Sequence, residues 1–424
     1  MKVIHTADLH LGQVIYQNYE RVDEHKHFFE QLTKWCKQEQ PDALLVSGDV
    51  FDIQQPSATT KKAFNDYFVS LHQACPDMHI VIIAGNHDSA SRIQADNSVW
   101  KLHNTHLIGA SPSIELLNSD DRTWMDNYVI SHDNGYIIAL PFMIGERQAL
   151  IQSILDYVAE INTSQKPVIM MGHLAVTGMD ATGHDIEIGK IKTLDIEAIG
   201  KGYDYLALGH IHKPQTIGHQ EDCMKHERVT YPSGVVRYSG SALHVSCDEQ
   251  YPHTVSVVEV DKHGGDVSIR QLRINELRHF YTLPLGGASY LSEEEALDGV
   301  RDFCTNSHEG GYIRLQIDYN TVLSANFTQQ VYDLIATYNN KVRYNAKIIW
   351  TGAPSSDEST QQKPIFEIAD LQQMTNPMAF IEKTFSQYPG LDLEEVRLAF
   401  EEVKTEIMRA KEEKEAKEKT KKQS

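Results

Sequence analysis

The sequence predicts an α/β layered core that is followed by a smaller second domain and by C-terminal helices. Three observations lead to this prediction. Short apolar runs alternate with amphipathic stretches over roughly the first 275 residues, which is typical of strands and helices packed in layers. Polar residues and glycines directly follow most of these apolar runs. A different alternation begins near Leu277.

Six short runs rich in Val, Ile or Leu predict strands in the first part of the chain. These predicted strands are Lys2–His5, Ala43–Ser47, Ile80–Ile83, Ile137–Leu140, Val168–Met171 and Tyr205–Leu208. Amphipathic helices are predicted between them, one with Phe28 and Leu32 on a single face and another with Phe64 and Phe68. Because layered α/β folds place their chemistry at strand ends, the polar residues after these strands are candidates for a functional site.

A small unit of alternating strands and helices is predicted after the core. Its elements are expected over His279–Leu285, Glu293–Phe303, Tyr312–Ile317, Phe327–Tyr338 and Lys347–Trp350. A polar stretch rich in Pro and Ser then predicts a linker, and the amphipathic helices after it predict a docking element for a partner rather than packing onto the same chain. We therefore expect a core at 1–275, a second domain at 276–351, a linker at 352–364, docking helices at 365–410 and a charged tail at 411–424.

Composition and charge narrow the class of protein. The 424 residues are 41% hydrophobic and 23% charged, as in ordinary globular proteins. The five cysteines are scattered without a CxxC pair, which argues against a disulfide framework or a zinc ribbon and favours a reduced, cytoplasmic protein. No apolar run is long enough for a signal peptide or a membrane span, so we expect no membrane association. The formal net charge of −20 argues against strong unaided binding to nucleic acid.

Five short polar motifs follow predicted strands, and together they carry the functional prediction. They are Asp8-Leu9-His10, Gly48-Asp49-Val50-Phe51-Asp52, Gly85-Asn86-His87-Asp88, Gly172-His173 and Gly209-His210-Ile211-His212. A single Asp or His after a strand is most often a cap or a loop residue. The placement of all five motifs at strand ends predicts one shared site. Glycines within four of them suit sharp turns that aim the next side chain at a common point.

These residue types suit a pair of divalent cations. Carboxylate, amide and imidazole ligands without a thiolate argue against a structural zinc site and favour Mn²⁺, with Fe²⁺ and Zn²⁺ as alternatives. Two such ions roughly 3.5–4 Å apart offset the charge repulsion that protects a phosphodiester from attack by water. The motifs therefore predict a phosphoesterase with two metal ions.

In order and spacing, the five motifs resemble those of calcineurin-like metallophosphoesterases. Within that superfamily, the chain is similar to the SbcD family of bacterial nuclease subunits. The runs that carry this similarity are Asp8-Leu9-His10-Leu11-Gly12, Gly85-Asn86-His87-Asp88-Ser89, Tyr238-Ser239-Gly240-Ser241 and Ser246-Cys247-Asp248-Glu249. Relatives commonly have an aromatic residue at the position of Cys247, a departure that we expect to affect packing rather than metal binding. The resemblance covers nearly the whole chain and implies a four-layer β-sandwich flanked by helices, with 276–351 as a capping domain.

The resemblance also implies roles for individual residues. The implied ligands of one metal are Asp8, His10, Asp49 and His212. The implied ligands of the second metal are Asp49, as a bridge, together with Asn86, His173 and His210. His87 would be a general acid or transition-state donor near the leaving oxygen, oriented by Asp88, because the ordinary pKa of imidazole lies near neutrality. A purely structural role for His87 stays open.

Other polar residues have weaker claims. We expect His5 to be packed within its strand and Asp52 to cap its loop rather than bind metal. Four histidines have no motif around them and are expected to have no functional role: His184, His219, His226 and His244. Four basic residues are candidates for phosphate contacts, with plain surface charge as the alternative: Arg92, Arg147, Lys213 and Arg237.

For function, the resemblance implies the nuclease subunit of an ATP-dependent complex that acts in DNA repair, recombination and replication. It implies 3′→5′ exonuclease action on double-stranded DNA and endonuclease action at hairpins or blocked ends. The implied partner is an SMC-family ATPase like SbcC, bound through the C-terminal helices, with two nuclease subunits pairing as a homodimer within a heterotetramer. A metal-dependent phosphomonoesterase and a scaffold that has lost its metals stay open as alternatives.

Overall fold

The computed structural model describes residues 1–16, 18–113, 115–116, 121–143, 148–182, 193–219, 227–307, 310–338 and 342–352. The chain divides into two compact units, Met1–Ala353 and Pro354–Ser424, and all described residues belong to the first. The predicted docking helices and tail, and nearly all of the predicted linker, lie outside the described residues. No described helix is both long enough and apolar enough to cross a membrane.

Helices of very different lengths occur in the described residues. They are α1 (Val22–Glu39), α2 (Ala58–Ala74), α3 (Ala90–Gln94), α4 (Asn97–Trp100), α5 (Gln148–Ile161), α6 (Ile196–Ile199), α7 (Glu293–Asn306) and α8 (Phe327–Ala336), with the 3₁₀ turns η1 (Lys101–His103) and η3 (Thr123–Asn127).

Two large sheets form the core. The seven-stranded sheet has the order β12 (Val229–Tyr231), β15 (Val267–Arg273), β14 (Thr254–Val260), β1 (Lys2–Thr6), β4 (Ala43–Ser47), β5 (His79–Ile83) and β6 (Thr105–Ile108). The six-stranded sheet has the order β11 (Gln215–Thr216), β13 (Val235–Tyr238), β10 (Tyr205–Gly209), β9 (Val168–His173), β8 (Gly135–Ala139) and β7 (Val129–His132). Strands β1, β4, β5 and β6 are parallel, and so are β8, β9, β10 and β13. All six strands predicted in this part of the chain are confirmed.

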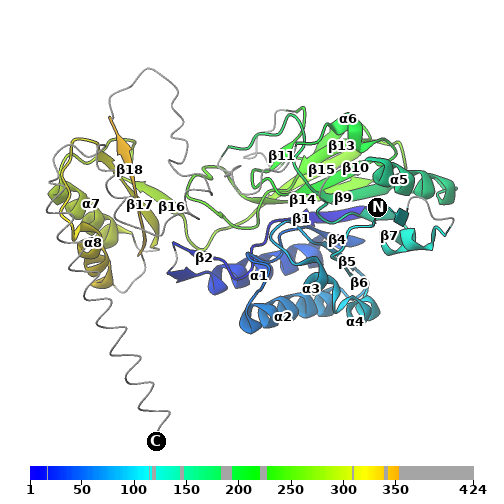
Figure 1. The fold of residues 1–424 in the computed structure, drawn as a ribbon, viewed down its shortest axis with the longest axis horizontal. Helices are drawn as coiled ribbons and strands as arrows, with labels where there is room; N and C mark the ends of the chain where they lie inside the picture. Colours follow the sequence, from blue (N-terminus) through cyan, green and yellow to red (C-terminus); the bar gives the residue numbers. More distant parts are fainter. Residues whose placement is uncertain are drawn as a thin grey trace, which may run out of the picture. The chain divides into compact units, whose positions relative to one another are not determined.

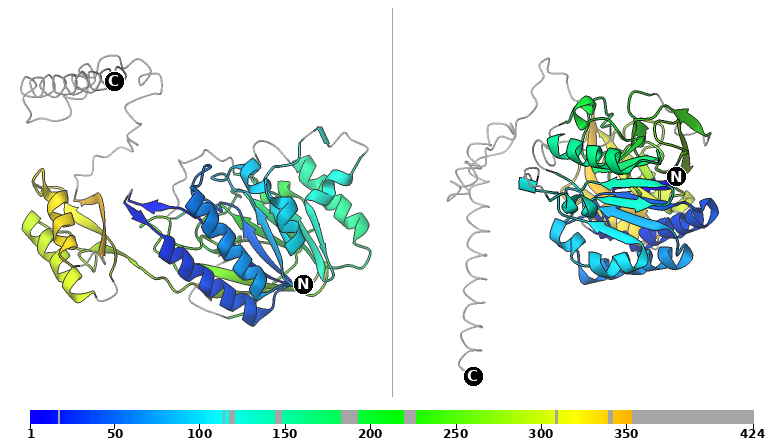
Figure 2. Two further views of the ribbon diagram at one scale, coloured as in Figure 1. Left: turned by 90° about the horizontal axis from the view of Figure 1, so that it is seen from below. Right: turned by 90° about the vertical axis from the view of Figure 1, so that its right-hand side faces the viewer.

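The sheets and helices stack in four layers (Figure 1). Buried side chains such as Val81 and Ile169 fill the space between the two sheets. The helices α1 and α2 cover the outer face of the seven-stranded sheet, where Phe28 and Phe68 join its core, and α5 covers the other sheet through Ile154 (Figure 2). The predicted α/β sandwich flanked by helices is therefore confirmed.

A three-stranded parallel sheet follows the core, with the order β16 (Phe280–Leu283), β17 (Gly311–Asp318) and β18 (Val342–Thr351). With α7 and α8 between its strands, it confirms the predicted order of strands and helices. It has its own buried core, which includes Leu315 and Val331. The domain limits assigned from the sequence stay predictions.

A buried carboxylate joins α1 to this small sheet. Glu24 is 2% exposed, and its Oε2 accepts hydrogen bonds from Arg21 at 2.7 and 3.1 Å. Its Oε1 accepts one from the Tyr312 hydroxyl of β17 at 2.5 Å and one each from Arg278 and Arg343 at 3.2 Å. Because four side chains converge on one carboxylate, the small sheet is attached to the core by a charged contact as well as by packing.

Replacing Glu24 with alanine is expected to lower the free energy of unfolding by about 3–5 kcal/mol, because it leaves the buried Arg21 without its counter-charge. Urea denaturation followed by circular dichroism measures this change. Glu30→Ala is the matched control, since Glu30 lies on the same helix with its side chain 64% exposed and should change stability little. Equal stability of the two variants would contradict the role given to this contact.

Candidate metal centre

All five motifs lie at the carboxyl ends of parallel strands from both large sheets. Asp8 and His10 follow β1, Asp49 follows β4, Asn86 follows β5, His173 ends β9, and His210 and His212 follow β10. Four of these residues have a positive φ, which side-chain-bearing residues rarely adopt: Asp8 (51°), His10 (46°), Asp49 (47°) and His210 (98°). Backbone strain of this kind gathers at functional sites, where the surrounding fold holds it in place.

Two glycines allow the loops to approach each other closely. A Cβ atom on Gly48, which has a φ of 90°, would lie 2.1 Å from Nδ1 of His173. A Cβ atom on Gly85 would lie 2.1 Å from Oδ1 of Asp49. Any larger residue at either position would displace a candidate ligand, so these two glycines are required by the geometry of the site.

The candidate ligands form two clusters. One consists of Asp8, His10 and His212, the other of Asp49, His173 and His210. All six are buried, and the ligand atoms within each cluster lie within 4.8 Å of one another.

Asp49 and Asn86 extend this arrangement. Oδ2 of Asp49 lies 3.4 Å from Nε2 of His173 in its own cluster and 4.0 Å from Nε2 of His10 in the other. Oδ1 of Asn86 lies 2.9 Å from Nε2 of His173. The fold thus brings all seven sequence-predicted ligands together, with Asp49 between the two clusters.

Burial and neighbouring charges shift the pKa values of several candidate ligands. Burial raises the pKa of Asp8 to about 7, partly offset by His173 and by the backbone N–H of His210, which donates to the carboxylate. Burial would lower the pKa of His10 and of His173, but neighbouring carboxylates raise both to about 9. Burial, together with neighbouring imidazoles such as His10, instead lowers the pKa of His212 well below its usual range.

The donor atoms fit divalent cations. Nε2 of His10 has no hydrogen-bond partner among the described residues, although the side chain is only 3% exposed. Buried polar atoms without such a partner are rare and need an explanation, which a bound cation would supply. The surrounding donors are carboxylate, amide and imidazole groups without a thiolate, a set typical of Mn²⁺, Fe²⁺ or Zn²⁺.

His87 lies beside the clusters and belongs to neither. Its ring centroid is 5.1 Å from that of His10, and its Nδ1 is 2.9 Å from the backbone oxygen of Asp52. The Asp88 carboxylate instead accepts backbone N–H bonds from Val50, Phe51 and Gly85, at 2.9 to 3.0 Å. Asp88 therefore fastens the second motif to the third, and its orienting effect on His87 stays a prediction.

Two polar contacts to the ligands had little signal in the sequence. Oδ1 of Asp52 lies 3.3 Å from Nδ1 of His10, so this residue is more than a loop cap. Oε1 of Glu249 lies 2.7 Å from Nδ1 of His212. Glu249 is in one of the runs that carry the family resemblance, and that was the only signal for it.

The weaker candidates have varied positions. His5 is packed as expected, with its Nδ1 2.7 Å from the Tyr205 hydroxyl. Arg237 is fully buried and donates to Ser256 and Thr216, so the prediction that it could contact phosphate is wrong. Lys213 forms an ion pair with Asp180.

Three further residues from the sequence analysis are described, and none of them belongs to a ligand cluster. Arg92 is exposed on α3, His219 packs against Tyr231, and His244 pairs with Glu276. Arg147, His184 and His226 lie outside the described residues.

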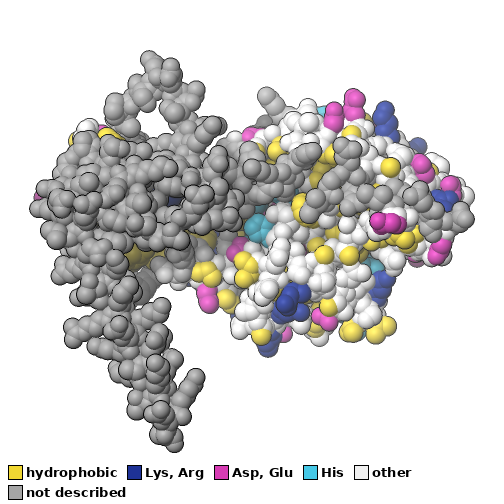
Figure 3. All heavy atoms as spheres, viewed as in Figure 1, with side chains coloured by type: hydrophobic (Ala, Val, Ile, Leu, Met, Phe, Trp, Pro, Cys, Tyr) yellow, Lys and Arg dark blue, Asp and Glu magenta, His cyan; other side chains and the backbone are white. Residues whose placement is uncertain are grey.

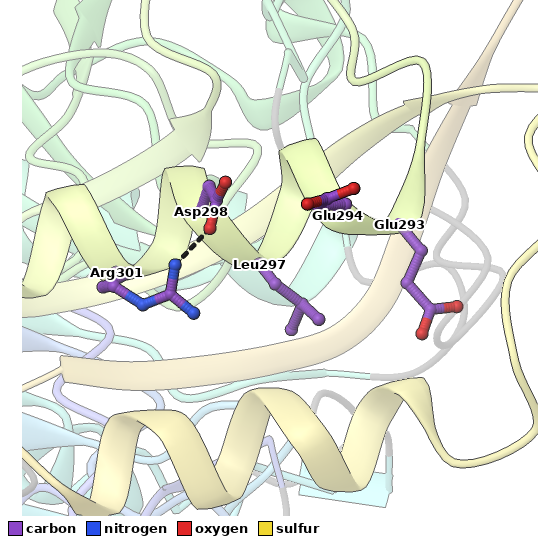
Figure 4. A pocket seen from close by; sticks show the side chains of 5 residues that line it. All are labelled: Glu293, Glu294, Leu297, Asp298 and Arg301. Atoms are coloured by element: carbon purple, nitrogen blue, oxygen red, sulfur yellow. Dashed lines mark hydrogen bonds and ion pairs between the residues drawn. The ribbon is translucent and has the colours of Figure 1, made fainter.

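A cavity of about 470 Å³ lies far along the chain from these motifs, on α7 (Figure 4). Its lining residues are Glu293, Glu294, Leu297, Asp298 and Arg301. Asp298 and Arg301 form an ion pair with each other, and Glu293 accepts hydrogen bonds from Ser324. Because Glu293, Asp298 and Arg301 already have partners, the cavity gives no sign of a second reactive site.

Comparisons with known proteins agree with this geometry. The chain is 30% identical over 285 residues to the SbcD protein of the SbcCD nuclease of Escherichia coli (strain K12). This alignment covers 60% of this chain and 65% of that protein. It is 27% identical over 323 residues to the SbcD protein of Rhodobacter capsulatus, covering 69% and 74%. For the SbcD protein of Bacillus subtilis, the identity is 28% over 272 residues, covering 61% and 66%. The chain thus spans somewhat less than two thirds of the Escherichia coli relative. Residues 1–214, half of the 424-residue chain, match the family described as calcineurin-like phosphoesterase, and the chain belongs to that family.

Proposed function

We propose that this chain is the nuclease component of an ATP-dependent complex of the SbcCD type and that it hydrolyses DNA phosphodiesters at a centre with two metal ions. One observation carries the proposal: two buried clusters of candidate metal-ligand side chains lie side by side, and Oδ2 of Asp49 is within 4.0 Å of a histidine in each. The similarity to several SbcD nucleases supports DNA as the substrate.

The proposed ligands divide between two positions. Asp8, His10 and His212 would hold one cation, while His173, His210 and Asn86 would hold the other, and Asp49 would bridge them. Mn²⁺ is the expected ion because oxygen and imidazole donors are mixed in both positions. When bound, such ions supply Lewis-acid activation of water and offset the charge of the phosphate.

His87 would provide a proton at the leaving oxygen. A carbonyl oxygen accepts hydrogen bonds only, so the contact with Asp52 fixes the proton of the His87 ring on Nδ1. The other nitrogen, Nε2, is then the atom that can hand a proton to the leaving oxygen. A general acid placed in this way typically contributes about 10²–10⁴-fold to the rate.

The proposed partner is an SMC-family ATPase like SbcC, bound through helices within 365–410, and the proposed assembly contains two copies of each protein.

The acidic charge of the chain supports the need for a partner in DNA binding. The chain has a formal net charge of −20. On the face drawn in Figure 3, the described Lys and Arg side chains are scattered and form no continuous basic surface. Because phosphate contacts dominate the affinity for DNA, the partner would supply much of the binding surface.

Two substrates test the proposal. With Mn²⁺, the chain together with its ATPase should cut a DNA hairpin and should degrade duplex DNA from the 3′ end, with little hydrolysis of an aryl phosphate. Fast hydrolysis of the aryl phosphate without DNA cleavage would favour the phosphomonoesterase instead.

Affinity for DNA provides a separate prediction. The isolated chain should bind a DNA duplex much more weakly than the complex with the ATPase, and binding of both should weaken as salt rises. Fluorescence anisotropy with a labelled duplex measures both affinities. Tight binding by the isolated chain would contradict the division of labour proposed here.

A further inference from the structure

A short segment between β13 and β14 contacts a candidate metal ligand, His212, on one side and the small sheet on the other. We call residues 245–249 the strap. We propose that Glu249, at the end of the strap, is a positioning residue that orients His212 as a metal ligand, and that the strap makes this orientation depend on the small sheet. The inference rests on the proposed two-metal function.

The contact between Glu249 and His212 fixes the state of the imidazole ring. Glu249 is 1% exposed, and its Oε1 lies 2.7 Å from Nδ1 of His212. Because a carboxylate accepts hydrogen bonds, Nδ1 carries the ring proton and Nε2 presents its lone pair. A histidine that binds metal through one nitrogen commonly donates its other N–H to a carboxylate in this way, which also fixes the angle of the ring.

The carboxylate of Glu249 is itself held by the strap. Its Oε2 accepts a hydrogen bond from the backbone N–H of Val245 at 2.9 Å, which links the first residue of the strap to the last. This contact leaves Oε1 directed at His212. Any shift of the strap backbone would therefore move the acceptor that orients the ligand.

The small sheet holds the strap from the other side. Arg314 of β17 donates through Nη1 to Sγ of Cys247 at 3.0 Å and to Oδ1 of Asp248 at 2.5 Å. Its Nε donates to Oγ1 of Thr282 in β16 at 2.8 Å, which anchors the guanidinium within the sheet. Cys247 and Asp248 directly precede Glu249, so three consecutive residues connect the small sheet to a candidate metal ligand.

The test measures metal binding rather than cleavage. The full chain is stripped of metal with a chelator, and Mn²⁺ binding is followed by equilibrium dialysis, with Co²⁺ absorption as a readout of ligand geometry. Glu249→Gln keeps the size of the side chain but removes the charge that holds the proton on Nδ1. We expect the affinity for one of the two ions to fall about 10–100-fold, with an altered Co²⁺ spectrum.

Asp204→Asn is the matched control. Asp204 is also fully buried, accepts backbone N–H bonds from Val168 and Gly264, and lies 3.0 Å from Nδ1 of a histidine, His263, which is not a candidate ligand. It should lose stability but keep its affinity for both ions. An equal loss of metal in this variant would mean that any buried carboxylate matters, and it would overturn the specific role of Glu249.

A second variant tests the strap without disturbing the buried site. The Asp248 side chain is 62% exposed, so Asp248→Ala should fold normally. Its affinity for the same ion should fall, but by less than in Glu249→Gln. Asp298→Ala is its control, because Asp298 is 57% exposed and also pairs with an arginine, Arg301 of α7. No difference between these two variants would overturn the coupling.

The outcomes separate the two proposals. If the parent chain binds no Mn²⁺, the proposed two-metal function fails. If the parent binds two ions and Glu249→Gln binds them equally well, the function stands and the inference about Glu249 fails.

Discussion

Replacing His87 with alanine is expected to abolish DNA cleavage while both metal ions stay bound. The ring of His87 belongs to neither ligand cluster, and its contact with the Asp52 carbonyl oxygen leaves Nε2 as the nitrogen that can exchange a proton. Loss of a general acid typically lowers the rate about 10²–10⁴-fold. Because no ligand is removed, the affinity for Mn²⁺ should change little.

Single-turnover cleavage of a hairpin, measured beside Mn²⁺ stoichiometry, separates chemistry from metal binding. His219→Ala is the matched control, since His219 is an exposed histidine that packs on Tyr231 and has no proposed role. It should cleave at the parent rate. Unchanged turnover in His87→Ala would leave His87 with a structural role only, and loss of metal would make it a ligand.

Local sequence patterns were sufficient for six of the eight parallel strands described in the core, all but β6 and β13, and they pointed to the candidate ligands near the ends of those strands. In β4, for example, a short and fully buried apolar run ends at Ser47, and Asp49 follows closely with an unusual backbone conformation. The pattern that predicts such a strand and the candidate ligand that follows it are therefore neighbours in the sequence. Strands such as β14 and β15 were not predicted, because no polar motif marks where they end.

Long-range contacts were beyond sequence reasoning. Glu249 acts on His212 across 37 positions, a contact that exists only because the strap folds back towards β10. Arg237 was a candidate for a phosphate contact, with surface charge as the alternative, but it lies between Val236 and Tyr238, which are both buried. A charged residue inside an apolar run was the available signal that it faces the interior.

Replacing Asp49 with asparagine is expected to remove both metal ions and, with them, cleavage. Its carboxylate lies between His173 and His10, and an amide keeps the shape of the group but loses the charge that would bridge two cations. Ligands that bind only the folded state raise its stability by mass action, by about 2.7 kcal/mol at a ligand concentration 100 times Kd. The parent should therefore melt at a higher temperature in Mn²⁺ than in a chelator, and Asp49→Asn should not.

Thermal denaturation with and without Mn²⁺ checks this prediction independently of any substrate. Asp204→Asn is again the control: it removes a buried carboxylate away from the candidate ligands, so its melting temperature should be low in both conditions but should still rise with Mn²⁺. If Asp49→Asn kept the full response to Mn²⁺, the ions would not depend on a carboxylate between the clusters. Each cluster would then have to bind its own ion independently, and a mechanism that needs both ions on one phosphate would lose its structural basis.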